Sequence, residues 1–230
     1  MTDLHDSTFA QLLAAERRGM ALLDAIEAAG IIAAGRSELE VEREIFAIAS
    51  RDFGVTEHWH DRIVRAGENT LCIAGEKAPD RVIADEDIVF LDLGPVFGAW
   101  EADVGRSYAV GSDPARRRLC DDLPIVFDAV KARYDADPEI TGAALYAFAH
   151  EQAEQRGWRF GGKIAGHLVG PFPHARGPGD RALRWIYPEN VTPMRGPDAH
   201  GAPRHWILEI HLVSQDGKFG GFYERLLEGD

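Results

Sequence analysis

The stretch VFLDLG at residues 89–94, followed by WEADVGRSY at residues 100–108, places an aspartate in each of two apolar, strand-like runs. Burying Asp92 or Asp103 without a partner costs on the order of several kcal/mol or forces protonation of the carboxylate. A metal ion is the simplest partner for both. If the two runs form one hairpin connected by residues 95–99, the side chains can converge on one point, and the rest of the chain must supply further ligands.

The second half of the chain contains three candidates for those ligands. His167 lies in GHLVG at residues 166–170, where the flanking glycines allow a close backbone approach. Glu209 and Glu224 each lie inside a later apolar run, in WILEIHLV and GFYERLL. A glutamate at the centre of an apolar strand is unfavourable unless it is paired. We therefore expect all three residues to approach the two aspartates.

Composition narrows the class of protein. A chain of 230 residues without a Ser/Gly/Pro-rich linker is expected to form one domain over residues 1–230. The 38 acidic and 25 basic residues give a net charge of −13, which argues against nucleic acid or an anionic membrane as partner. A small peptide or amide is the expected partner instead.

The N-terminus and the cysteines point to a soluble cytoplasmic protein without a thiolate site. The first residues lack the basic and apolar regions of a secretory signal, and no apolar stretch approaches the roughly 18 residues that span a bilayer. Cys72 and Cys120 are the only cysteines, so neither a disulfide framework nor a thiolate zinc site is expected. Any metal must be held by oxygen and imidazole ligands.

Hydrophobic periodicity predicts two helix pairs, each followed by strands. Ser37 and Glu40 form a capping-box pattern for the second helix, and Pro124 predicts a kink or break in the third. The expected helices cover about 7–29, 37–54, 114–134 and 141–156, and the expected strands about 61–66, 87–93, 99–110, 206–213 and 221–227. The repeated order hints at an internal duplication.

The five residues, in this order, resemble the ligand pattern of the pita-bread metallopeptidases, the family of methionine aminopeptidase, aminopeptidase P and prolidase. The matching motifs are Asp92-Leu93-Gly94, Asp103, Gly166-His167-Leu168-Val169-Gly170, Glu209 and Glu224. The resemblance implies an α/β (α+β) fold in which a helix-helix-hairpin unit is duplicated by a pseudo-twofold around a curved antiparallel sheet. It divides the single catalytic domain into leading helices over 1–56 and a metal-binding core over 61–230.

The resemblance also implies roles for individual residues. Asp92, Asp103, His167, Glu209 and Glu224 would ligate two divalent ions that share a water, and this oxygen-rich set suits Mn²⁺, Fe²⁺, Co²⁺ or Zn²⁺. Glu209 would also move the proton of that water, and His174 would contact the substrate carbonyl and the tetrahedral intermediate. The candidates for substrate binding are His58, His60, Trp100 and His211.

The implied activity is that of a dinuclear hydrolase of the aminopeptidase or Xaa-Pro dipeptidase type, acting on a peptide or small amide bond. Two alternatives keep the fold: a metal-independent, creatinase-like C–N hydrolase, and a non-catalytic module that binds peptides or proteins. The family places a histidine on the loop before the first aspartate, whereas residues 69–87 contain none. The substrate, the metal and the oligomeric state, with a homodimer as one option, are left open.

Each candidate residue also has a purely structural interpretation. Asp92 and Asp103 can be solvated carboxylates at a hairpin end, and the two glutamates can face outward on edge strands. His167 can be a hydrogen-bonded core histidine, and His174 a loop histidine. The remaining histidines can be structural, and strand aromatics such as Trp100 are commonly core.

Overall fold

The computed structural model describes residues 2–73, 75–173, 181–198 and 201–228, apart from the side chains of residues 2–7, 181 and 182. Its mixed helix and strand content confirms the predicted α/β class. In chain order the elements are α1 (Thr2–Ala28), α2 (Glu38–Phe53), β1 (Ile63–Ala66), the 3-10 helix η1 (Gly67–Leu71), β2 (Ile88–Leu93), β3 (Val96–Phe97), β4 (Trp100–Glu101), β5 (Val104–Ala109), α3 (Pro114–Ala136), α4 (Gly142–Gln155), β6 (Arg159–Phe160), β7 (Gly166–Val169), η3 (Arg181–Arg184), β8 (His205–Val213) and β9 (Gly220–Leu226).

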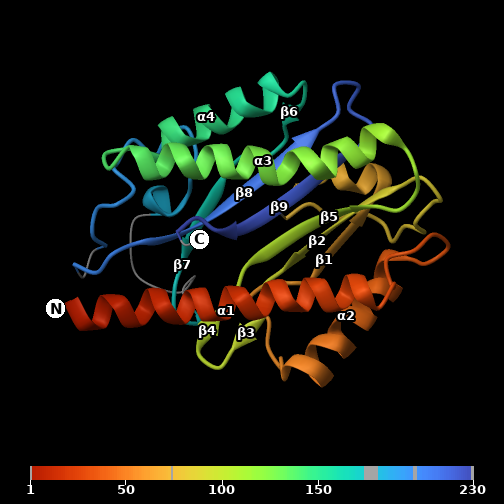
Figure 1. The fold of residues 1–230 in the computed structure, drawn as a ribbon, viewed down its shortest axis with the longest axis horizontal. Coiled ribbons are helices and arrows are strands. Elements are labelled where there is room, and N and C mark those ends of the chain that lie inside the picture. The colour runs from red at the N-terminus through yellow and green to blue at the C-terminus, as the bar shows by residue number, and fades with distance from the viewer. Residues whose placement is uncertain (1, 74, 174–180, 199–200, 229–230) are drawn as a thin grey trace.

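A seven-stranded sheet runs through the molecule in the order β1-β2-β5-β9-β8-β6, and β7 also pairs with β8. The strand pairs are antiparallel. Each half of the sheet follows a helix pair in the chain, so the expected order of helix, helix and strands occurs twice. Figure 1 shows α3 and α4 along the side of β8 and β9, and α1 and α2 along the side of β1, β2 and β5.

Alternation along the strands separates an apolar face from a polar one. Leu91 and Leu93 on β2 join α1 and α2 in one buried cluster, and Leu208 and Ile210 on β8 join α3 and α4 in another. The residues between them, among them Asp92, point to the opposite face of the sheet. Both helix pairs therefore leave one face of the sheet available for a site.

Local signals explain most of the helix boundaries. Ser37 and Glu40 form the expected capping box at the start of α2, which Gly54 ends in a left-handed conformation. Pro124, expected to kink or break the third helix, does not break it, because α3 continues through this residue. The neighbouring Leu123 and Val126 are buried against the sheet, and this packing offsets the hydrogen bond that proline removes.

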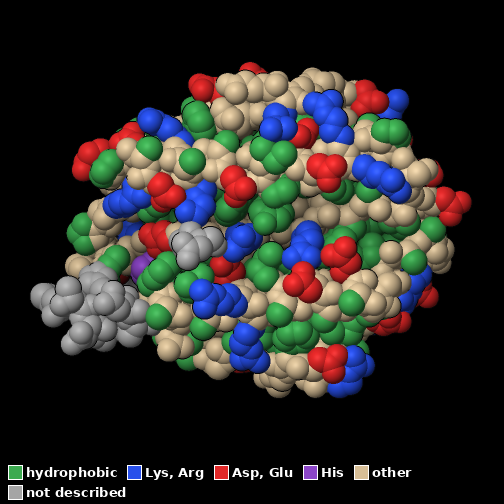
Figure 2. Space-filling model, in the orientation of Figure 1, with side chains coloured by type: hydrophobic (Ala, Val, Ile, Leu, Met, Phe, Trp, Pro, Cys, Tyr) green, Lys and Arg blue, Asp and Glu red, His purple; other side chains and the backbone are tan. Residues whose placement is uncertain are grey.

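The surface carries charges of both signs. Figure 2 shows basic and acidic side chains interspersed over the face it displays, with apolar side chains between them. None of the helices in the described part of the chain combines the length and the apolar character needed to cross a membrane.

The two halves of the sheet meet where β5 lies beside β9. Gly105 pairs with Glu224 in this register. Farther along, the Ser107 hydroxyl donates to the Phe222 carbonyl (2.9 Å) and accepts from the Phe222 amide (2.7 Å). A second connection is made by buried Thr70 in η1, whose hydroxyl accepts from the Gly220 amide at 2.8 Å. Side-chain hydroxyls therefore join the two halves at both places.

We predict that Ser107→Ala lowers the free energy of unfolding by about 1–3 kcal/mol, because it leaves the Phe222 amide and carbonyl without this partner. Urea denaturation followed by circular dichroism measures the change. Ser50→Ala, at an exposed position of α2, is the control and is expected to be close to neutral. Equal effects of the two substitutions would contradict the structural role of Ser107.

Candidate metal centre

Three acidic residues form one row across the sheet. Asp92 lies opposite Gly105, Gly105 opposite Glu224, and Glu224 opposite Glu209. Residues that are directly opposite in a sheet share a face, so the three carboxylates project to the same side. Glycine is needed within the row, because a Cβ at Gly105 would lie 2.6 Å from the ring of Phe222 and 3.1 Å from the Cβ of Glu224.

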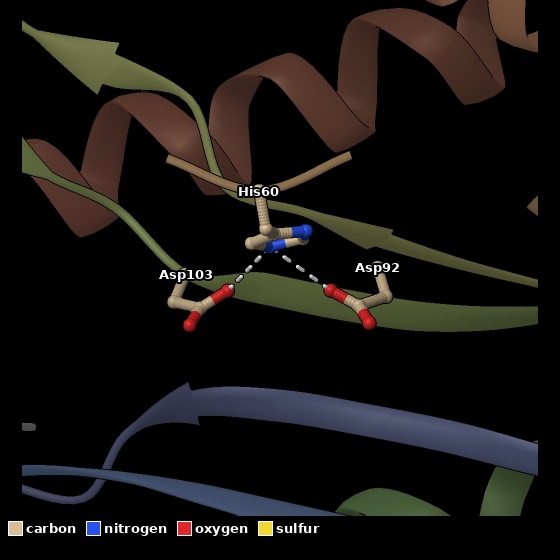
Figure 3. A group of neighbouring side chains, drawn as sticks. All are labelled: His60, Asp92 and Asp103. Carbon is tan, nitrogen blue, oxygen red and sulfur yellow. Dashed lines mark hydrogen bonds and ion pairs between the residues drawn. The ribbon is translucent and has the colours of Figure 1, made fainter. Parts of the chain in front are cut away.

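Asp103 lies just before β5, and only 1% of its side chain is exposed. Its Oδ1 is 3.3 Å from Nε2 of His60, while its Oδ2 is 3.0 Å from Nε2 of His167. The two oxygens of one carboxylate therefore face two different imidazoles. Figure 3 shows the first side of this arrangement, in which His60 lies between Asp103 and Asp92.

His167 reaches the row from β7. Pairing of β7 with β8 sets His167 opposite Ile207, two residues before Glu209. Its Nδ1 lies 2.8 Å from the Leu168 carbonyl oxygen, which can only accept, so Nδ1 carries the hydrogen. Nε2 thus faces the acids, at 3.7 Å from Glu209 Oε1 and 3.8 Å from Glu224 Oε1. A carbonyl that fixes the ring in this way is a common feature of metal-bound histidines.

The structure brings together all five residues expected as metal ligands. The possible ligand atoms form two groups, and within each group all atoms lie within 4.8 Å of one another. The first group comprises His60, Asp92 and Asp103. The second comprises Asp103, His167 and Glu224. His60, expected to bind substrate, is in the first of these groups. The residues around His60 do not predict that it lies beside Asp92 and Asp103, since His60 is in a loop far from both aspartates in sequence.

The other residues expected at the substrate site lie in different places. His211 borders the same cavity as Asp92 and Glu209, and its Nε2 is 2.8 Å from the Thr70 carbonyl oxygen. His58 lines a second hollow beside α2, which Trp59 and His60 also line. Trp100 packs against an apolar cluster. His174 lies outside the described residues.

Burial dominates the electrostatics of the site. It raises the pKa of Asp92, Glu209 and Glu224, and neighbouring carboxylates raise these pKa values further. Burial acts in the same direction on Asp103, but hydrogen bonds from His167 and His60 hold the pKa of Asp103 well below its usual range.

The two imidazoles respond to the same charges. Burial disfavours the charged rings, yet the adjacent aspartates outweigh it and raise the pKa of His60 to about 10. Asp103 likewise raises the pKa of His167 to about 9. The same carboxylates that raise the pKa of both imidazoles favour a cation among them.

The donor set fits divalent metal ions. Four carboxylates and neutral imidazoles supply hard oxygen and borderline nitrogen ligands, and two divalent ions would neutralise the four acids formally. Glu224 Oε2 is buried and has no hydrogen-bond partner among the described residues, as expected of an atom that ligates an ion. A cation would therefore relieve both the repulsion and the unsatisfied oxygen.

Comparison with known proteins identifies the same fold. A family model described as metallopeptidase family M24 matches residues 10–192, a range that ends before Glu209 and Glu224. Similar solved structures include a prolidase from Thermococcus sibiricus (TM-score 0.70, 18% identity, 96% of this chain and 59% of that chain) and an X-Pro aminopeptidase from Thermotoga maritima MSB8 (0.69, 21%, 98% and 62%). An Xaa-Pro dipeptidase from Bacillus anthracis gives a TM-score of 0.69 at 23% identity over 95% of this chain and 57% of that chain.

These similarities confirm the expected pita-bread fold. The chain spans about three-fifths of the length of the solved structures it matches. No curated protein sequence matches it.

We predict that the protein retains two divalent ions per chain, and that Asp103→Ala and Glu224→Ala each retain less than one. Each substitution removes a buried oxygen donor from the group of Asp103, His167 and Glu224, and Asp103 also belongs to the group of His60 and Asp92. Metal analysis by mass spectrometry after loading with Mn²⁺ or Co²⁺ and dialysis measures the ratio. Asp128→Ala, at an exposed position of α3, is the control. Unchanged occupancy in the two variants would mean that other residues bind the metal.

We also predict that the chelated protein becomes less stable as the pH rises from about 6.5 to 9. His167 and His60, whose pKa values are raised from 6.5, contribute stability that is lost as the pH passes their folded pKa values. Glu209, with its pKa raised to about 7, acts in the same direction. Below pH 6.5 the burial that lowers the pKa of His58 to about 4 acts oppositely, so the window lies above it.

Urea denaturation of the chelated protein at several pH values measures this dependence, with the Mn²⁺-loaded protein as reference. Metal should reverse the trend, since rising pH removes the protons that compete with the ions. Stability of the chelated form that increases between pH 6.5 and 9 would contradict the electrostatic description of the site.

Proposed function

This chain belongs to metallopeptidase family M24, and from this premise we propose that it is a metal-dependent hydrolase of the aminopeptidase or dipeptidase type, acting on a peptide or small amide bond. The observation that carries the proposal is the position of Asp103, whose Oδ1 lies 3.3 Å from Nε2 of His60 and whose Oδ2 lies 3.0 Å from Nε2 of His167. A carboxylate in this position suits two ions better than one.

The proposed ligands fall into two groups around Asp103. Asp92 and Asp103 would hold one ion, and Asp103, His167, Glu209 and Glu224 the other. When bound, such ions polarise a scissile carbonyl and lower the pKa of a water molecule. The protein contributes the fixed positions of the donors and a face of the sheet that is sheltered from bulk solvent.

Glu209 is proposed to transfer a proton. Its side chain is 15% exposed, against 3% for Glu224, and it lines the cavity beside the cluster. A carboxylate that lines the cavity beside the ligand cluster can accept a proton from a bound water and return it to the product. Glu224, more deeply buried, is suited to metal binding alone.

The cavity supports a small peptide as substrate. It measures about 300 Å³ and opens beside Asp92 and Glu209. Phe90 and Phe222 provide apolar wall, with ring centroids 5.4 Å apart. Arg65 and Lys163 also line it, and a guanidinium and an ammonium group suit the carboxylate of a peptide. We infer a substrate with an apolar side chain and a free C-terminal carboxylate.

The solved neighbours include proteins described as prolidase, X-Pro aminopeptidase and Xaa-Pro dipeptidase. We take from them the class of reaction to be tested. The missing loop histidine leaves specificity for proline open, so the assay must include dipeptides with and without proline.

We predict that the Mn²⁺- or Co²⁺-loaded protein hydrolyses free dipeptides and that chelation abolishes the activity. Glu209→Gln is expected to lower kcat by about 10²- to 10⁴-fold, because it removes a proton carrier from the cavity. A panel of Xaa-Pro and other dipeptides, each free and C-terminally amidated, measures kcat and KM.

Glu151→Gln, at an exposed position of α4, is the matched control. A preference for free over amidated peptides would support the roles of Arg65 and Lys163. Activity that survives thorough chelation would instead favour the metal-independent alternative. Lack of turnover across the whole panel, with metal bound, would argue against the hydrolase.

A further inference from the structure

We propose that His60 is a metal ligand, the third protein donor to the ion held by Asp92 and Asp103. This inference rests on the proposed dinuclear site and adds to it a nitrogen donor from the loop before β1. The position is distinct from the family's usual loop histidine, for which residues 69–87 provide no candidate.

The orientation of the imidazole is the first argument. His60 Nδ1 lies 2.6 Å from the Asp61 carbonyl oxygen, which can only accept, so Nδ1 carries the hydrogen. Nε2 then points at Oδ1 of Asp92 and Oδ1 of Asp103, each at 3.3 Å (Figure 3). A hydrogen on Nε2 can bond only one of these two oxygens well, whereas a divalent ion could be bound by the nitrogen and both carboxylates at once.

The matching environment of His167 is the second argument. In both histidines Nδ1 faces a backbone carbonyl and Nε2 faces Asp103. His60 approaches Oδ1 of this aspartate, and His167 approaches Oδ2. Since His167 is the proposed imidazole ligand of one ion, His60 occupies the equivalent position for the other, so that each ion has one nitrogen donor.

The third argument is that the fold holds His60 in place. The Trp59 amide donates to the Gly94 carbonyl at 2.9 Å, and the Val96 amide donates to the Glu57 carbonyl at 3.0 Å. A Cβ on Gly94 would lie 2.4 Å from the Trp59 ring and 2.5 Å from the His60 ring. The glycine that ends β2 therefore makes room for the histidine.

Trp59 completes the placement of both imidazoles. Its ring meets His60 edge-on at a centroid distance of 4.5 Å and His167 at 5.3 Å. A side chain that contacts both rings limits their rotation. His60 is thus preorganised beside the carboxylates, as expected of a ligand.

The additional nitrogen has a chemical consequence. An ion held only by carboxylates favours hard cations such as Mn²⁺, whereas an imidazole donor favours Co²⁺ or Zn²⁺. With one imidazole on each side of Asp103, both sites would offer a nitrogen donor to Co²⁺. Without His60, the Asp92 side should become the weaker site.

The experiment compares His60→Ala with the unmodified protein and with His58→Ala, a control two residues away on the same loop. Co²⁺ titration by calorimetry gives the number and affinity of bound ions, and X-ray absorption of the loaded protein gives the number of imidazoles per ion. We expect two ions and one imidazole per ion in the unmodified protein. His60→Ala should lower the affinity for one ion at least about tenfold, since loss of a partner outside the ligand shell already lowers metal affinity by that factor. It should also halve the number of imidazoles per ion.

Other results separate this inference from the proposed function. Two ions of unchanged affinity and an unchanged imidazole signal in His60→Ala would overturn the role of His60 and leave the dinuclear site intact. A raised KM with unchanged metal binding would do the same and assign His60 to the substrate. An unmodified protein that binds no Co²⁺ would remove both proposals.

A second variant guards against misfolding. Circular dichroism of the chelated proteins checks the fold, and His60→Gln replaces the ring by a side chain that fills similar space. If His60→Ala does not fold, His60→Gln decides by the same two measurements. Gly94→Ala would displace the His60 ring and should therefore also lower the affinity for the ion held by Asp92 and Asp103.

Discussion

Burial of several carboxylates in one row of a sheet is the constraint on which this structure depends. Asp92, Glu224 and Glu209 occupy opposite positions on neighbouring strands, and Asp103 closes the group from the start of β5. Their mutual repulsion and loss of hydration oppose folding. Positive charge at their centre is therefore a structural requirement as well as a chemical device, and the orientation of the imidazoles follows from it.

The arrangement of two helix pairs on a sheet leaves one face of the sheet free to carry the acidic residues. Each helix pair covers the same side of its half of the sheet, so alternate strand residues remain for the opposite side. The register between β5 and β9 then aligns residues from the two halves. A slip of one residue in that register would turn the glutamates away from the aspartates, and for this reason the site depends on the junction between the halves.

The sequence predicted those site residues whose charge contrasts with apolar neighbours in the same strand. Asp92, Glu209 and Glu224 interrupt apolar strands, and such interruptions are visible without a structure. His60 lies in a loop with no comparable contrast, and long-range hydrogen bonds of this loop to Gly94 and Val96 bring it to the acids. The helix over about 114–134 was predicted, but its continuity through Pro124 was not, since it depends on tertiary packing around that residue. Periodicity predicted the order of helices and strands and the resemblance implied the fold class, whereas neither predicted the pairing of β5 with β9.

Thr70 affects what the cavity can accept. Its hydroxyl holds the start of β9, and its carbonyl oxygen lies against His211, so one residue of the first half fixes two strands of the second. The wall formed there cannot be displaced by a simple hinge between the halves without breaking both contacts. Discrimination among ligands on this side should therefore depend on the fixed shape of the wall around His211.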